Sequence, residues 1–339
     1  KIDISSRKQS VEYYFISIVP VLPNRIMEGG NQSGVSEFIL LGLSDQPEKQ
    51  RLLFFLFLVM YLITGLGNLL IILAISTNSR LHTPMYFFLS NLSLVDICFT
   101  STTIPKMLTN HVSGKKAIPY VECITQLFFF VLFGEIDSVL LTVMAYDRYV
   151  AICAPLQYTM LMTPKICALL VAMSWFWAYI NALTQTVLLT RLSFCGHNEI
   201  PHFFCDISSV LKLACSDTFI NDVVLLAVGG LTVIIPFIGI LISYTRIFVT
   251  VMRIPSASGK WKAFSTCGSH LTVVCLFYGT IIGVYFSPTS THTAQQDTTA
   301  AIMYTVVTSM LNPFIYSLRN KDMKGALRVL FTRKPGLSL

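Results

Sequence analysis

Carboxyl side chains interrupt two long apolar stretches of the sequence. Asp96 lies in the first stretch and Asp137 lies in the second. An ionisable group inside such a stretch is costly to bury, so it normally faces other helices and often serves a function. Asn68 and Asn312 lie at comparable depth in two further stretches. Together these groups could hold a sodium ion or shared protons. The alternatives are a hydrogen-bond network that fixes helix packing, and a proton pump.

Glu135 lies close to Asp137 in the sequence but on another face of the same helix. Two residues of separation place the side chains about 200° apart around a helix. If Glu135 faces a cavity, it can bind a hydrogen-bond donor on a ligand. If it does not, it is a hydrogen-bonded group between helices.

The histidines and the motif search favour neither a transition-metal site nor an enzyme. His270 has no second His or Cys at zinc-ligand spacing, so we expect it to pack between helices or to face the cytoplasm. His197 and His202 stand between two cysteines, but a disulfide-rich loop explains those cysteines better than a metal site. The sequence contains no H-E-x-x-H, G-x-S-x-G or phosphate-binding glycine loop. We therefore predict no enzyme activity and no cofactor apart from the candidate sodium ion.

The composition indicates that these residues are positioned by helices within a membrane. Of the 339 residues, 54% are hydrophobic and 12% are charged, whereas soluble chains have about 25% charged residues. The 24 Phe, 14 Tyr and 3 Trp exclude a disordered chain. We expect the lipid bilayer as a partner and no nucleic acid.

Seven stretches are long and apolar enough to cross a bilayer as helices, which takes about 20 residues each. Four contain no Asp, Glu, Lys or Arg: residues 52–75, 166–189, 223–244 and 298–317. Three more hold the polar groups described above: residues 84–108, 123–146 and 264–286. The runs are continuously apolar, which argues against a β-barrel. The sequence therefore predicts an all-α membrane protein with a seven-transmembrane helix bundle.

The basic residues favour an extracellular N terminus and a cytoplasmic C terminus. In this orientation 13 Lys and Arg accompany two acidic residues on the cytoplasmic side. Four cysteines then lie on the outer side, Cys123, Cys195, Cys205 and Cys215. An even number suits disulfides in an oxidising compartment, although four cysteines allow three pairings. Asn31 begins an N-x-S glycosylation tripeptide on the same side.

The two ends of the chain differ from the bundle. Residues 1–26 form an N-terminal extension that we expect to be disordered, and residues 27–51 form an extracellular segment. The bundle covers residues 52–318. Residues 319–339 form a cytoplasmic tail, in which a basic, amphipathic stretch predicts a short helix on the inner membrane surface.

Several motifs, in order and on the expected spans, resemble the olfactory receptor branch of the rhodopsin-like G-protein-coupled receptors. Residues 144–153 read MAYDRYVAIC, at the cytoplasmic end of the third span. The other matches are FILLGL at 38–43, Gly67-Asn68, LHTPMYFFL at 81–89, Ser243-Tyr244, KAFSTCGSHL at 262–271 and NPFIYSLRN at 312–320. Ser309 departs from the family, which usually has proline there, so we expect a straighter local backbone.

This resemblance implies a plasma-membrane odorant receptor that binds small, mostly apolar volatile molecules and activates a stimulatory heterotrimeric G protein. It also implies the disulfide pairs Cys123–Cys205 and Cys195–Cys215. The opposing hypothesis is a seven-helix proton or ion carrier that uses Asp96, Glu135 and Asp137. A retinal-type pump would need a lysine in the last span, and residues 298–317 contain none.

The motifs also contain residues that suit a switch between two arrangements. Asp147 and Arg148 can hold an ion pair at rest and release the guanidinium toward a partner on activation. Pro313 deprives the seventh helix of a backbone donor and permits a kink. The predicted switch residues are Asp147, Arg148, Tyr149, Tyr244, Asn312, Pro313 and Tyr316.

The resemblance places the ligand among the outer halves of the third, fifth, sixth and seventh helices. Helical spacing then selects the residues on the inner faces. They are Phe130, Val131, Gly134, Glu135, Val228, Thr232, Tyr278, Ile281, Tyr285 and Thr305. The competing interpretation is that this stripe is only interhelical core.

Overall fold

The computed structural model describes residues 35–43, 46–285, 299 and 301–332. The N-terminal extension at residues 1–26 and the glycosylation candidate Asn31 lie outside the described residues, as does the side chain of Tyr285. The contacts divide the chain into two units, residues 1–34 and 35–339, and everything that follows concerns the second unit.

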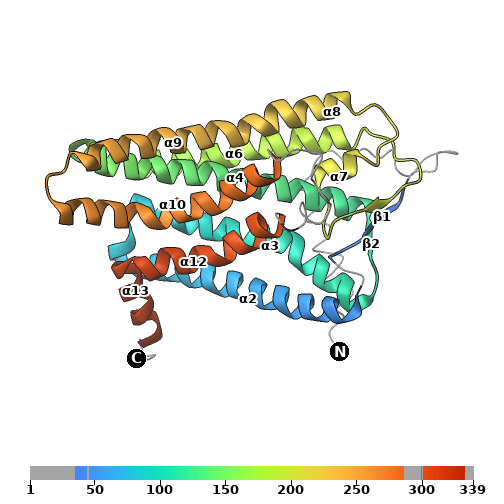
Figure 1. The fold of residues 1–339 in the computed structure, drawn as a ribbon, viewed down its shortest axis with the longest axis horizontal. Coiled ribbons are helices and arrows are strands. Elements are labelled where there is room, and N and C mark those ends of the chain that lie inside the picture. Colours follow the sequence, from blue (N-terminus) through green and yellow to red (C-terminus); the bar gives the residue numbers. More distant parts are fainter. Residues whose placement is uncertain (1–34, 44–45, 286–298, 300, 333–339) are drawn as a thin grey trace, which may run out of the picture. The chain divides into compact units, whose positions relative to one another are not determined.

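Long helices make up the described part of the chain (Figure 1). They are α2 (Pro47–Thr77), α3 (Pro84–Ser113), α4 (Tyr120–Cys153), α6 (Pro164–Leu189), α9 (Gly230–Met252), α10 (Ala257–Tyr285) and α12 (Thr308–Arg319). Helix α8 (Phe219–Val224) continues through the π-helix η4 (Leu225–Gly229) into α9, and the π-helix η6 (Met303–Val307) leads into α12. Short helices lie in the connections: η2 (Ser79–Leu81), η3 (Pro155–Gln157), α5 (Tyr158–Leu161) and α7 (Ile207–Leu211).

The lengths and compositions of these helices suit a bilayer. Within the described residues, five are long and apolar enough to cross a membrane, and the bent helix α10 makes six. The seventh predicted span corresponds to η6 and α12, and the residues before it, 286–298 and 300, are not described. The fold is the seven-helix membrane bundle expected from the sequence.

Local sequence signals explain where the helices begin. Helices α2, α3 and α6 each start with a proline, which lacks the N–H that would have no partner in the first turn. The Thr163 side chain accepts a hydrogen bond from the Ile166 N–H and caps α6. Helix α3 ends at Ser113, and the next residue, Gly114, has a φ of 65° in the left-handed region that favours glycine.

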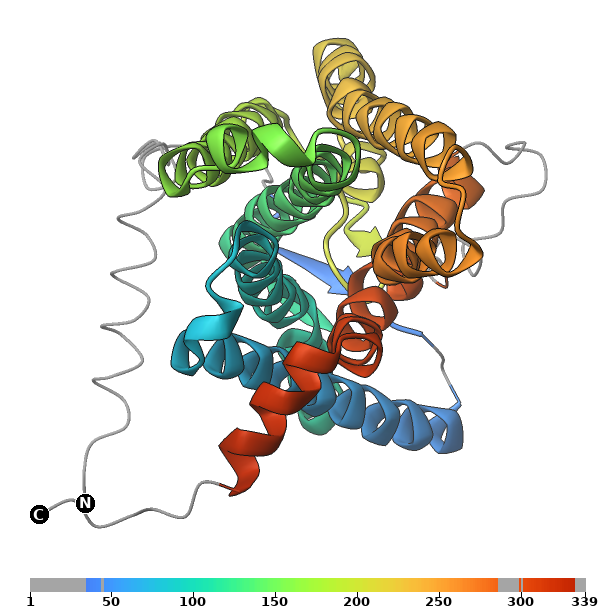
Figure 2. The ribbon, with the colours of Figure 1, turned by 90° about the vertical axis from the view of Figure 1, so that its left-hand side faces the viewer.

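Helix α4 forms the centre of the bundle. In its most apolar stretch 67% of the residues are buried, compared with 11% in the helix from Phe219 to Met252. Seen along the helices, α4 is surrounded by its neighbours and the α8–α9 helix lies at the periphery (Figure 2). A residue on α4 is therefore the most able to contact several spans at once.

Helices α2 and α12 approach each other closely at a glycine. A Cβ atom added to Gly67 would lie 3.0 Å from Cγ of Pro313. Beside this contact, the Asn68 side-chain amide donates a hydrogen bond of 3.2 Å to the Ser309 carbonyl. The pair Gly67-Asn68 thus serves to dock the first span on the last.

A three-stranded sheet, which the sequence analysis did not predict, lies at one end of the bundle. Strand β1 (Glu37–Leu40) is central; it pairs antiparallel with β2 (Ala117–Pro119) and parallel with β3 (Glu199–Ile200). Phe38 faces Ile118 in this register, and both side chains are buried. We call this the disulfide end, because Cys123–Cys205 and Cys195–Cys215 lie here.

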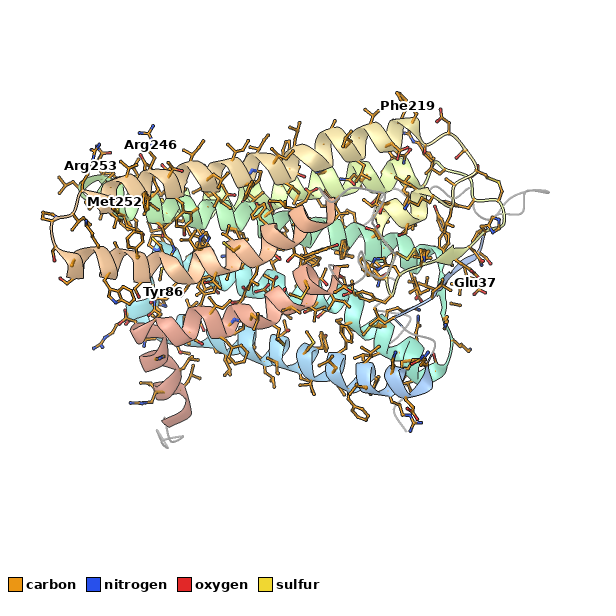
Figure 3. All side chains as sticks on the ribbon, viewed as in Figure 1. Glu37, Tyr86, Phe219, Arg246, Met252 and Arg253 are labelled. Atoms are coloured by element: carbon orange, nitrogen blue, oxygen red, sulfur yellow. A yellow bond between two sulfur atoms is a disulfide. The ribbon has the colours of Figure 1, made fainter. Side chains whose placement is uncertain are left out.

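The opposite end carries the amphipathic helix α13 (Lys321–Thr332), and we call it the α13 end. Helix α13 turns sharply away from the axis of α12 (Figure 1). Met323 and Ala326 are buried on one face, whereas Lys324 and Arg328 are exposed. Figure 3 shows Arg246 and Arg253 at this end, and Glu37 and Phe219 at the disulfide end.

Candidate functional site

A polar core joins α3, α4 and α12 in the middle of the bundle. Nδ2 of Asn312 donates a hydrogen bond of 2.8 Å to Oδ2 of Asp96. Ser309, the serine that replaces the family's usual proline, lies beside Asp96 and adds a polar group here. Asp137 lies within electrostatic reach of Asp96. The structure therefore brings together the groups predicted to converge.

This core is rich in acceptors that lack donors. Within the described residues, no hydrogen bond reaches Oδ1 of Asn68, Asp96, Asp137 or Asn312. Carboxylate and amide oxygens are the ligands that hard cations prefer. No cluster of three or more His, Cys, Asp or Glu side chains occurs in the described part of the chain. The core is thus chemically suited to sodium or shared protons and not to zinc.

The arrangement of Asp147 and Arg148 differs from the expected ion pair. Oδ1 of Asp147 accepts a hydrogen bond of 2.8 Å from the hydroxyl of Tyr158, in α5. Nη2 of Arg148 lies 3.7 Å from the sulfur of Met85, in α3. Successive helical residues point about 100° apart, so the two side chains face different neighbours. Among the described residues, the one ion pair is Lys106–Glu122.

Tyr158 is suited to remain the donor in this contact. It lies outside the membrane-spanning helices, and burial together with the Asp147 carboxylate raises the pKa of Tyr158 above its usual range. The phenol therefore stays protonated at neutral pH.

A second contact at the α13 end ties three spans together. The Tyr244 hydroxyl lies 2.7 Å from Nδ1 of His270, and Nε2 of His270 lies 3.0 Å from the carbonyl oxygen of Leu141. A carbonyl only accepts, so Nε2 carries the hydrogen and Nδ1 accepts from Tyr244. His270 is fully buried, so it packs between helices and does not face the cytoplasm.

The other predicted switch residues lie around this contact. Tyr149 packs on the apolar cluster of Ile247, Val251 and Cys267, as does Tyr244. Tyr316 is buried, and its hydroxyl has no hydrogen-bond partner among the described residues. Pro313 lies inside α12 against Gly67.

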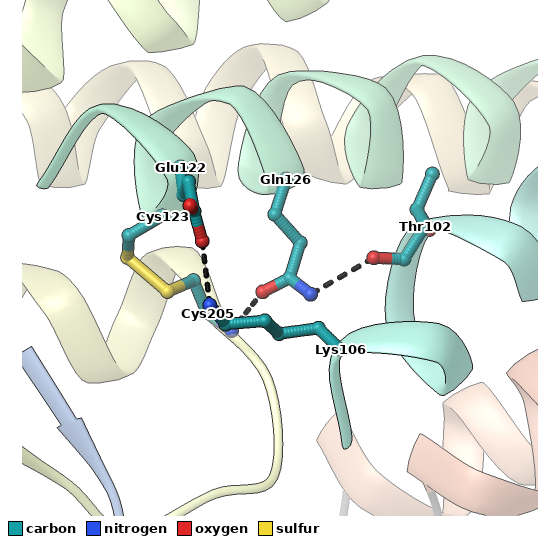
Figure 4. Close-up of a disulfide and its surroundings, with 6 residues drawn as sticks. All are labelled: Thr102, Lys106, Glu122, Cys123, Gln126 and Cys205. Atoms are coloured by element: carbon teal, nitrogen blue, oxygen red, sulfur yellow. Dashed lines mark hydrogen bonds and ion pairs between the residues drawn. A yellow bond between two sulfur atoms is a disulfide. The ribbon is translucent and has the colours of Figure 1, made fainter. Parts of the chain in front are cut away.

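Side-chain contacts hold the disulfide end together around Cys123–Cys205 (Figure 4). Oε1 of Gln126 accepts a hydrogen bond of 2.9 Å from the Cys205 N–H, and its Nε2 donates one of 2.8 Å to the Thr102 carbonyl. Nζ of Lys106 lies 2.5 Å from Oε2 of Glu122. Cys195 pairs with Cys215. These are the two pairs that the resemblance implies.

The predicted ligand residues fall into separate environments. The ring of Phe130 lies 4.7 Å from that of Phe204, in the loop that carries Cys205. A Cβ atom on Gly134 would lie 3.5 Å from the Phe99 ring, so Gly134 faces α3. Val131, Val228 and Ile281 are half-buried. The Thr305 hydroxyl donates to the Ala301 carbonyl within its own helix, at 2.6 Å.

Tyr278, another of these residues, is almost fully buried. Its hydroxyl is 2.7 Å from the hydroxyl of Ser138, and its ring is 4.9 Å from that of Phe237. With 1% exposure, it packs as interhelical core that links α10 to α4 and α9.

Glu135 contacts helix α6. Nδ2 of Asn181 donates a hydrogen bond of 2.5 Å to Oε1 of Glu135, and Thr232 also lies within hydrogen-bond reach. This geometry makes Glu135 a hydrogen-bonded group between helices, and its Oε2 has no hydrogen-bond partner among the described residues. Asn181 in turn accepts from Nε2 of Gln185 at 3.3 Å.

A cavity of about 130 Å³ lies apart from all of these residues, between β1, α2 and α3. Its wall includes Leu41, Phe54 and His111, and none of the predicted ligand residues lines it.

Comparison with known proteins decides the family. The model of the olfactory receptor family matches residues 57–334. Olfactory receptor 1f45 of Rattus norvegicus is 62% identical over 91% of this chain and 99% of its own length. Olfactory receptor 1F1 of Homo sapiens is 60% identical over 91% and 98%, and olfactory receptor 1E5 of Pan troglodytes is 59% identical over the same shares.

The chain belongs to the olfactory receptor family. It is accordingly a multi-pass plasma-membrane receptor of the G-protein-coupled class, and it is not an enzyme. Family membership also accounts for the motifs that carried the resemblance, and in the structure these motifs include the Gly67–Pro313 helix contact and the Tyr244–His270 contact.

This olfactory receptor contains polar contacts that the sequence analysis missed. Asn181 and Gln185 are four residues apart in a span without charged residues, so they share one helical face. That spacing was the available signal, since polar side chains in a membrane helix commonly bond to other helices. Gln126 and Tyr158 carried no such signal, because their partners are a loop N–H and a carboxylate on another element.

Proposed function

We propose that this receptor binds small, mostly apolar volatile molecules in the half of the bundle near the disulfide end. We further propose that it activates a stimulatory heterotrimeric G protein at the α13 end. The disulfide end and residues 27–51 then face the outside, where Asn31 is glycosylated, and residues 319–339 lie in the cytoplasm. The exposed basic side chains of Arg246, Arg253, Lys324 and Arg328 support this orientation.

The observation that carries the signalling proposal is the Tyr244–His270–Leu141 contact beside Arg148. Single hydrogen bonds join α9, α10 and α4 there. Arg148 acts electrostatically on both Tyr244 and His270. Few and weak links of this kind can exchange between two arrangements, which a G protein can select.

We propose that the polar core binds a structural sodium ion through Asp96 and Asp137. The support is the set of four acceptor oxygens without donors, with Ser309 as an additional oxygen group. A cation there would favour one arrangement of α3, α4 and α12.

The carrier alternative lacks a continuous path among the described residues. Glu135 bonds to α6, whereas Asp96 bonds to α12, and no hydrogen bond within the described ranges joins the two groups. Cyclic-AMP production on odorant exposure, without a transmembrane current, separates the receptor from a carrier.

Replacement of Arg148 tests the signalling proposal. Arg148→Ala should abolish the cyclic-AMP response and leave surface expression largely intact, because the guanidinium is the group offered to the G protein. Arg246→Ala, which removes an exposed arginine at the same end, is the matched control and should respond normally. An unimpaired Arg148→Ala response at equal surface expression would contradict the proposal.

A further inference from the structure

Helices α4, α6 and α9 enclose a polar cluster that the signalling contacts do not use. We call Glu135, Asn181, Gln185 and Thr232 the Glu135 cluster. A hydrogen-bond chain runs from Gln185 through Asn181 to Glu135, with lengths of 3.3 Å and 2.5 Å. No member is more than 8% exposed. The cluster is therefore shielded from bulk solvent and from lipid.

Two oxygens of the Glu135 cluster lack a donor. Within the described residues, Oε2 of Glu135 and Oε1 of Gln185 have no hydrogen-bond partner. The hydroxyl of Thr232 has one hydrogen, which it donates to the Gly229 carbonyl at 2.7 Å, so it does not satisfy Glu135. A buried acceptor without a donor is unfavourable and is rare in native structures. The cluster is thus incomplete without a further group.

The backbone beside the cluster is irregular. The π-helix Leu225–Gly229 lies beside the Glu135 cluster, and π-bulges within α-helices occur frequently at functional sites. A Cβ atom on Gly229 would lie 3.7 Å from Nε2 of Gln185, so the π-helix borders the cluster directly. Val228, one of the predicted ligand residues, belongs to the same π-helix. The cluster therefore adjoins the proposed odorant site.

We propose that the Glu135 cluster is the polar anchor of the odorant site, and that it selects odorants carrying a hydroxyl group. This inference rests on the proposed function and specifies its ligand class. An odorant hydroxyl donates to Oε1 of Gln185 or to an ionised Glu135, and it accepts from Glu135 when that carboxyl is protonated. An ether oxygen only accepts, and it leaves Gln185 unpaired.

The expected discrimination is large for so small a chemical change. A site built to bond a hydroxyl rejects analogues that lack one, because its own buried polar groups then remain unpaired. Asn181 and Gln185 are specificity-determining in this scheme. Asn181 orients the Glu135 carboxylate, and Gln185 offers the second acceptor.

Isomeric alcohols and ethers provide the test, because the two members of each pair share one molecular formula and only the alcohol carries an O–H donor. The panel includes octanol with dibutyl ether, and phenylethanol with benzyl methyl ether, and each member is titrated in cells with a cyclic-AMP reporter. We expect the agonists to be alcohols with half-maximal concentrations about 10-fold or more below those of their ether isomers. Glu135→Met and Gln185→Met should each reduce this ratio toward one.

Thr184→Val is the matched control, because Thr184 is exposed on the same helix as Gln185 and its hydroxyl donates to the Ile180 carbonyl, one turn earlier in that helix. It should keep the wild-type ratio. If either cluster variant fails to reach the surface, the other variant and the wild-type isomer ratios decide the question.

Three results would overturn the inference. Equal potency of alcohols and ethers in the wild type would refute the ligand class and leave the odorant-receptor function intact. An alcohol preference that persists in both cluster variants would refute the anchor. A receptor present at the surface that no odorant activates would refute the proposed function, and the ligand class with it.

Discussion

The two ends of the bundle are held together by different kinds of bond. At the disulfide end, two disulfides, a backbone-paired sheet and the Gln126 bridge join the loops to α3 and α4. At the α13 end, single side-chain hydrogen bonds such as Tyr244–His270 join the helices. Covalent and backbone links fix one geometry, whereas isolated side-chain bonds can be exchanged. This difference is why we propose ligand capture at the disulfide end, the stiff end, and switching at the α13 end, the exchangeable end.

The largest expected effect comes from removing a disulfide at the disulfide end. Cys123→Ala should destabilise the receptor by about 2–5 kcal/mol, because the bond to Cys205 closes the longer loop of the two disulfides. Cys195→Ala should cost about 1 kcal/mol less in the chain-entropy model, since its bond spans 20 residues and not 82. Antibody labelling of intact cells measures the loss of surface receptor.

Cys275→Ala is the control for both disulfide variants, since Cys275 is a free, exposed thiol. It should label like the wild type. Equal labelling of Cys123→Ala and Cys275→Ala would show that the disulfide does not stiffen this end.

Between the two ends, the contact of α2 with α12 offers the next largest effect. Gly67→Ala places a methyl group 3.0 Å from Pro313, which forces the helices apart and should cost about 1–3 kcal/mol. Gly65→Ala lies on the same helix, and its methyl group would meet no atom within 4 Å. The melting temperature of purified receptor should fall for Gly67→Ala and stay level or rise for Gly65→Ala. A similar change in both variants would mean that helix propensity, and not the contact, controls stability.

A smaller effect is expected from loosening the exchangeable end. Tyr244→Phe removes one hydrogen bond, worth about 1 kcal/mol, and weakens the contact of α10 with α9. A shift of that size changes a two-state population about 5-fold, so basal cyclic AMP should rise. Tyr146→Phe, which alters an exposed tyrosine at the same end, should leave basal signalling unchanged. Unchanged basal cyclic AMP in Tyr244→Phe would make the contact a packing element alone.

Sequence reasoning succeeded where the signal was local or periodic. Apolar length predicted the seven spans, and the depth of Asp96 and Asn312 predicted a contact that the structure shows at 2.8 Å. It failed where the partner is distant in the chain. The sheet pairs residues 37–40 with residues 117–119 and 199–200, and no alternating pattern marks such short strands. Sequence adjacency also did not reveal that Asp147 bonds to Tyr158 while Nη2 of Arg148 lies near Met85, because successive helical side chains point about 100° apart.

The same limitation applied to the ligand residues. Spacing placed Gly134 on the inner face of α4, but its position against Phe99 depends on how α3 packs. Helical spacing also left two roles open for Glu135, ligand binding and a hydrogen bond between helices. The position of α6 in the structure is what identifies Asn181 as its hydrogen-bond partner. Periodicity determines which residues share a face, whereas interhelical packing determines which neighbour that face meets.

The smallest expected effect distinguishes the sources of stiffness at the disulfide end. The Lys106–Glu122 ion pair lies beside Cys123–Cys205, but its side chains are 25% and 50% exposed. Exposed pairs contribute about 0–1 kcal/mol because water screens the charges and two long side chains must be ordered. Lys106→Met should therefore leave both the melting temperature and odorant potency nearly unchanged. Gln126→Leu should lower the melting temperature clearly, because it leaves the buried Cys205 N–H without its acceptor. If Lys106→Met proved the more harmful substitution, charge rather than backbone satisfaction would hold this end together.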